Sequence, residues 1–171
     1  MKKILLFSTL IAIALLSCSK TNKSKIAPTA TISATIDGVN VTFTSKDTVR
    51  TSGSTGIYIT GSNDTTLNKI MLFINSTTGL DTGTYITHSP AVKSLQMLYG
   101  VGPGYTADNY YFTYDISGGT HYDGVVTVTS VNSTNIKGTF SGSVVLESSV
   151  LSTGTLPSKV ITNGKFNLAI Q

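Results

Sequence analysis

Residues Thr31 to Phe43 read Thr-Ile-Ser-Ala-Thr-Ile-Asp-Gly-Val-Asn-Val-Thr-Phe, and this stretch decides the fold class. Apolar and polar residues alternate on both sides of Asp37-Gly38, a dipeptide suited to a type I′ turn between two strands. A two-residue turn places all the apolar positions on one face of the hairpin by pairing Ile36 with Val39, Ala34 with Val41, and Ile32 with Phe43. We therefore predict an antiparallel hairpin with one face in a hydrophobic core.

The rest of the chain continues in short apolar or alternating runs separated by Gly, Asn, Asp and Ser. The polar segment 44–54 is predicted to be a loop, and the run 70–74, apolar on both faces, a central strand covered on both sides. Gly138 and Gly142 lie on the apolar face of a strand predicted over 135–145, which indicates close approach of another layer or a bend. The final strand is predicted to place Val160, Thr162 and Gly164 on one face with Phe166.

This pattern predicts an all-β protein with almost no helix. We expect an antiparallel β-sandwich of about nine or ten strands. A closed or partly open up-and-down β-barrel, similar to a lipocalin, is the alternative.

The N-terminus has the features of an export signal. Lys2 and Lys3 precede an apolar run over 4–16, which is too short to span a bilayer as a stable helix. Residues 15–18, Leu-Leu-Ser-Cys, resemble the lipobox that lipoprotein signal peptidase reads, and Cys18 is the only cysteine in the chain. The sequence therefore predicts a signal peptide over 1–17, a lipidated flexible tether over 18–28 and a single all-β domain over 29–171.

Cys18 is the predicted lipid attachment site. The expected product carries a diacylglycerol thioether on the sulfur and an acyl chain on the new amino group, and several acyl chains hold a protein on a membrane stably. Ser19 follows where an Asp tends to retain lipoproteins in the inner membrane, which favours the outer membrane. Acidic residues typical of surface export are missing there, so we expect the periplasmic face, with the cell surface as the alternative.

The formal net charge of +4 is carried mainly by the signal and the tether. From Thr29 onward there are seven Lys or Arg and eight Asp or Glu. Nucleic-acid binding needs clustered positive charge on the folded domain, so we expect no nucleic-acid partner.

Several fragments together resemble a family of small Bacteroidetes-type β-rich lipoproteins of unknown function. The resemblance implies an all-β fold and an envelope location, and it supplies no catalytic residue. It is carried by segments 33–39, 59–62, 83–85, 136–141 and 161–167.

No catalytic set, metal site or cofactor site is predicted. His121 and Asp123 are two residues apart, and Asp115 could approach them, but a solvent-exposed loop explains these residues better. His88 lies in a predicted turn. The stretch 138–142, Gly-Thr-Phe-Ser-Gly, lies on a predicted strand rather than on the strand-to-helix turn that a hydrolase nucleophile needs.

Tyrosines cluster between positions 99 and 122 around two glycine-rich loops. A tyrosine offers a flat apolar face and a hydroxyl, which suits stacking on sugars or on partner proteins. Tyr105, Tyr122 and Tyr99 are the predicted contact residues. Thr48 and Thr65 follow an Asp in a short pattern that resembles a periplasmic O-glycosylation acceptor.

The sequence is most consistent with a non-catalytic envelope lipoprotein that acts as a binding or structural module for a glycan or an envelope protein. A β-barrel carrier of a small apolar ligand and a hydrolase are the alternatives.

Overall fold

The computed structural model describes residues 30–50, 55–87, 93–104, 106, 109–115, 121–147 and 156–171, with backbone only for 45, 47–50, 114, 115 and 121. These residues are all-β and contain thirteen strands, so the predicted fold class is confirmed. The strands are β1 (Thr31–Ile36), β2 (Val39–Phe43), β3 (Ser45–Arg50), β4 (Gly56–Ser62), β5 (Lys69–Ser76), β6 (Gly83–Ile86), β7 (Lys93–Gly100), β8 (Tyr110–Phe112), β9 (Tyr114–Asp115), β10 (His121–Tyr122), β11 (Gly124–Val131), β12 (Asn135–Leu146) and β13 (Ser158–Ala169).

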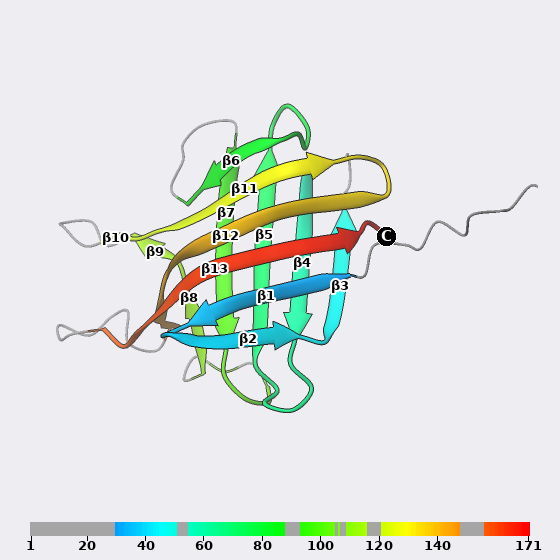
Figure 1. The fold of residues 1–171 in the computed structure, drawn as a ribbon. Coiled ribbons are helices and arrows are strands. Elements are labelled where there is room, and N and C mark those ends of the chain that lie inside the picture. The colour runs from blue at the N-terminus through cyan, green and yellow to red at the C-terminus, as the bar shows by residue number, and fades with distance from the viewer. Residues whose placement is uncertain are drawn as a thin grey trace, which may run out of the picture.

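Eleven strands form one sheet that bends into two crossing layers. Its order is β2-β1-β13-β12-β11-β6-β7-β5-β4-β3, and β8 pairs with both β12 and β7. Figure 1 shows the layer of β11, β12, β13, β1 and β2 crossing steeply in front of the layer of β7, β5, β4 and β3. The pairing of β8 closes a five-strand barrel through β12, β11, β6 and β7, with extra strands on both sides.

This closure is consistent with the predicted barrel alternative. A core between two packed layers is also a feature of a β-sandwich. The connectivity differs from a simple up-and-down barrel because β6 and β7 meet in parallel, at Ile86 and Ser94.

The first hairpin has the predicted register. Ile36 pairs with Val39, Ala34 with Val41, and Ile32 with Phe43. Burial follows the prediction except at Val41, which is partly buried, and at Val39, which is 65% exposed. Val39 lies beside the hairpin turn at the start of β2, and burial rises along the same strand to Phe43, which is fully buried.

The prediction of a loop over 44–54 is wrong for its first half. Residues Ser45–Arg50 form β3, which pairs along its whole length with β4. An edge strand can form on backbone hydrogen bonds to one neighbour without an alternating apolar face, so periodicity could not reveal it.

The last strand changes face at a bulge. Asn163 adopts a φ of 54°, and the register with β12 shifts between Phe140 and Gly142. The extra residue reverses the alternation, so Ile161 is buried and Val160 is 49% exposed, contrary to the prediction.

Side chains from both layers fill the space between them. The cluster holds aliphatic and aromatic residues of both layers, among them Ile32, Phe43, Ile57, Leu72, Met97, Val126, Ile136 and Phe166. The Phe140 and Phe166 rings stack with centroids 6.4 Å apart. The predicted close approach of another layer is confirmed at Gly142, where a Cβ would lie 2.6 Å from the Met97 methyl carbon of β7. At Gly138 the space is filled from the same layer, by the Phe166 ring of β13.

Candidate functional site

Strands β6 and β8 lie along the same edge of β7, one near its start and the other near its end, and they separate from each other at its middle. Near its start β7 pairs with β6 through Ser94 and Ile86, and near its end it pairs with β8 through Leu98 and Phe112. Between them, the Thr113 N–H donates to the Met97 carbonyl at 3.0 Å, and the Met97 N–H donates to Thr113 Oγ1 at 3.3 Å. We call this opening and its rim the β7 wedge, formed by Phe73, Thr87, Ser94, Gln96, Leu98, Phe112, Thr113 and Glu147.

The β7 wedge contains two adjoining hollows open to the outer surface. One, of about 340 Å³, is lined in part by Phe73, Ser94 and Gln96. The other, of about 240 Å³, is lined in part by Phe112 and Glu147. Gln96 and Thr113 line both hollows, so the two can be occupied by one elongated ligand.

Polar groups in the β7 wedge are left available for a ligand. The side chains of Gln96, Ser94 and Glu147 have no hydrogen-bond or ion-pair partner among the residues that the structure describes. Thr113 is only 7% exposed, and its Oγ1 accepts one hydrogen bond while its own proton meets no acceptor in the same part of the chain. A buried hydroxyl proton without an acceptor is costly, and a bound acceptor would relieve that cost.

A pair of stacked aromatic rings borders the larger hollow. Tyr58 on β4, Phe73 on β5 and Gln96 on β7 are in register across the outer face of the layer. The Tyr58 and Phe73 rings stack with centroids 4.4 Å apart and an interplanar angle of 19°, and Tyr58 is 40% exposed. We call this pair of rings the platform: Tyr58 is stacked on Phe73, and Phe73 lines the larger hollow, where it offers an aromatic contact to a ligand.

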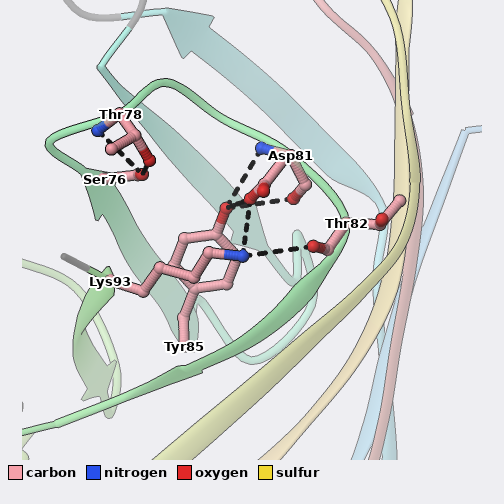
Figure 2. Close-up of polar contacts among 6 residues, drawn as sticks. All are labelled: Ser76, Thr78, Asp81, Thr82, Tyr85 and Lys93. Carbon is pink, nitrogen blue, oxygen red and sulfur yellow. Dashed lines mark hydrogen bonds and ion pairs between the residues drawn. The ribbon is translucent and has the colours of Figure 1, made fainter.

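A hydrogen-bonded cluster fixes the β6 side of the β7 wedge (Figure 2). The Tyr85 hydroxyl donates a hydrogen bond to Asp81 Oδ1 at 3.0 Å and accepts one from the Asp81 N–H at 3.2 Å. Lys93 Nζ is 2.7 Å from Asp81 Oδ1, 3.2 Å from the Thr82 carbonyl and 5.2 Å from the centre of the Tyr85 ring. Tyr85 belongs to β6 and Lys93 begins β7, so these contacts supplement the single bridge between the two strands.

Two carboxylates make the stability of the fold depend on pH. The Lys93 ammonium, and then the Tyr85 hydroxyl, hold the pKa of Asp81 below its ordinary value. At the first hairpin turn, Lys159 at 2.8 Å and the Val160 N–H lower the pKa of Asp37. A lowered carboxyl pKa contributes stability that is present above the unfolded pKa and is lost as the pH falls through the folded one.

We expect the urea midpoint of unfolding to be flat near neutral pH and to fall below about pH 4. The double variant Asp37→Asn and Asp81→Asn should start from a lower midpoint at pH 7 and lose less of it on acidification. Urea titrations at a series of pH values measure this. An equal acid slope in both proteins would show that other groups cause it.

The predicted contact tyrosines fall in different places. The prediction that Tyr99 is a contact residue is wrong. Tyr99 is 3% exposed in the core, where its hydroxyl accepts a hydrogen bond from Asn68 Nδ2 at 3.0 Å, so it offers no contact surface. Tyr122, in β10, is half-buried and precedes Asp123, which lines a further hollow with Thr87. Tyr105 lies outside the described residues.

The other predicted sites are placed only in part. Thr65 is exposed in the turn after β4, while Thr48 lies in β3 with only its backbone described. Cys18, the signal, the tether and His88 lie outside the described residues. No described helix is both long and apolar enough to traverse a bilayer.

The backbone of His121 pairs with that of Asp115 across β9 and β10. In the part of the chain that the structure describes, no three His, Cys, Asp or Glu side chains are grouped to hold a metal ion.

Comparisons with protein-family models, curated proteins and solved structures return no match for this chain.

Sequence reasoning missed the aromatic platform, although a signal for it was present. The run 70–74 is apolar on both faces, and the prediction that this strand is covered on both sides is wrong. Instead Ile70, Leu72 and Ile74 enter the core, while Met71 and Phe73 face outward and remain partly exposed. Apolar residues on the outer face of a sheet can equally indicate a contact surface.

Proposed function

We propose that this protein is a lipid-anchored, non-catalytic binding module of the bacterial cell envelope, whose ligand is a glycan or an envelope protein. The observation that carries the proposal is the β7 wedge, where unpartnered polar side chains adjoin the Tyr58–Phe73 platform. A pocket with a few convergent polar groups beside apolar surface is the usual form of a recognition site.

The position of the β7 wedge suits a protein attached through its N-terminus. Thr31 pairs with Asn167, so β1 begins beside the C-terminal end of β13. β8 pairs with Val145 and Leu146, at the other end of the long β12. Figure 1 shows β7 and β8 on the left and the start of β1 on the right, beside the C-terminus. A chain attached at Cys18 would reach at most about 40 Å to Ala30. The attachment point and β8 would then lie at opposite ends of β12 and β13.

The packing of the core favours this proposal over an apolar-ligand carrier. The buried cluster occupies the space between the layers, and the hollows described above open outward. A carrier would need an enclosed apolar cavity large enough for its ligand.

The test is a pull-down of the acylated protein from the envelope of its native host, with polysaccharides and proteins analysed together. The wild type should retain a ligand, and the double variant Tyr58→Ala and Gln96→Ala should lose most of it. Val160→Ala, which alters an exposed side chain on the other layer, is the control and should retain it. Equal capture by all three proteins would refute a recognition role for the β7 wedge.

A second readout addresses the anchor. Cys18→Ala should abolish acylation and release the protein from the membrane fraction, measured by intact mass and by fractionation. An unacylated wild-type protein would contradict the anchor while leaving the binding test valid.

A further inference from the structure

The geometry points to an uncharged oligosaccharide, bound lengthwise along the outer face of β7, as the ligand of the β7 wedge. This inference rests on the proposed binding function and narrows it to one class of ligand. It is carried by the shape of the site, the kinds of polar groups in it and its charge.

The shape fits a chain of rings rather than a single small molecule. The two hollows adjoin at Gln96 and Thr113, with Phe73 bordering one and Phe112 bordering the other. The Phe73 ring lines the first hollow, and Tyr58 on the next strand is stacked on it and is 40% exposed. Sugar rings present flat C–H faces that stack on aromatic rings, and successive rings of a chain can occupy successive hollows.

The polar groups match ligand hydroxyls, which both donate and accept. Gln96 supplies an amide donor and acceptor, Ser94 a hydroxyl and Glu147 a carboxylate acceptor. None of these three has a partner among the described residues, and the buried Thr113 hydroxyl has an unused proton beside them. An extended peptide is a weaker match, because it would require a row of backbone pairing groups, whereas the middle of the β7 edge is already bonded to Thr113.

The charge of the site favours a neutral chain over an anionic one. Glu147 is the single charged side chain among the described residues that line the two hollows. Lys93 begins β7, but its ammonium is already bound to Asp81 and the Thr82 carbonyl. A polyuronate or a phosphorylated glycan would therefore place its charges beside a carboxylate without a compensating cation.

The absence of tryptophan from the chain provides a direct assay. Phe73→Trp places a single tryptophan on the platform while keeping an aromatic ring there. The full acylated chain carrying this change, in a detergent without a sugar headgroup, is titrated with cellohexaose, maltohexaose and mannohexaose. Hexagalacturonate, an anionic chain of the same length, is titrated in parallel. At least one neutral hexasaccharide should shift the fluorescence saturably, and hexagalacturonate should not.

Variants in the same background locate the binding. Tyr58→Ala should weaken the neutral sugar about tenfold, because the aromatic ring at position 73 loses the ring that is stacked on it. Gln96→Ala should weaken it about fivefold through loss of hydrogen bonds. Val160→Ala should bind like the parent, and each variant's thermal unfolding is measured to show that it is folded.

Three results would overturn the inference. The first is tighter binding of hexagalacturonate than of any neutral hexasaccharide. The second is binding of a neutral hexasaccharide that neither Tyr58→Ala nor Gln96→Ala weakens. The third is no fluorescence response to any of the sugars. The protein could bind no sugar in the titrations and still capture an envelope protein in the pull-down, with capture lost when Tyr58 is replaced. In that case the proposed binding function would stand and only the ligand class would be wrong. If the pull-down also failed to depend on Tyr58 and Gln96, both would be wrong.

Discussion

Replacing Tyr85 with alanine is expected to lower the free energy of unfolding by about 3–5 kcal/mol. The Tyr85 side chain is fully buried, so the change leaves a cavity in the core. It also removes the hydroxyl that Asp81 contacts through its N–H, its carbonyl and its carboxylate. Urea unfolding followed by far-ultraviolet circular dichroism measures the loss.

The variant Tyr85→Phe separates the two contributions. It keeps the ring in the core and removes only the hydroxyl, so the expected loss is about 1–3 kcal/mol. It should also raise the pKa of Asp81, because the Tyr85 hydrogen bond is one of the contacts that lower it. If Tyr85→Phe cost as much as Tyr85→Ala, packing of the ring would contribute nothing and our account of the cluster would be wrong.

The second large effect is expected at Gly138, on β12. A Cβ there would lie 2.4 Å from the Thr127 carbonyl oxygen and 2.5 Å from Cζ of the Phe166 ring. The carbonyl is part of the β11–β12 pairing and cannot move without breaking it. Gly138→Ala should therefore destabilise the protein by about 1–3 kcal/mol through overpacking.

The sign of this effect is the informative result. At an unstrained strand position without a clash, alanine in place of glycine stabilises a protein by about 0.4–1 kcal/mol. Thr139→Ala, at the exposed neighbouring position, is the matched control and should change stability by less than about 1 kcal/mol. A stabilised Gly138→Ala variant would show that the Phe166 ring and the Thr127 carbonyl do not fill the space beside this glycine.

Much of the fold could be predicted because its signals are local. The Asp37-Gly38 turn and the alternation around it determine the register of the first hairpin, which the structure reproduces pair by pair. The glycines of β12 indicated close packing because a missing side chain on an apolar face leaves space that another group must fill. Local errors arose where one residue changes the phase, as at Asn163, or where a strand pairs without an apolar face, as in β3.

The candidate site could not be predicted in the same way. Gln96, Thr113 and Glu147 lie on three separate segments, and nothing in their local sequence relates them. The tyrosine cluster drew attention to Tyr99, which the register of β7 turns into the core. Tyr58 and Phe73 have no sequence motif, and they become a platform only because β4 and β5 are adjacent in the sheet.

The sequence alone therefore determined the all-β class, the first hairpin and the close packing at the glycines, because turn geometry and side-chain alternation act over a few residues. Only the tertiary structure decided that β8 closes the sheet and that β6 and β8 part along β7. Strand order depends on contacts between residues far apart in the chain. The β7 wedge is a consequence of that order, since it forms where two strands share one edge without meeting.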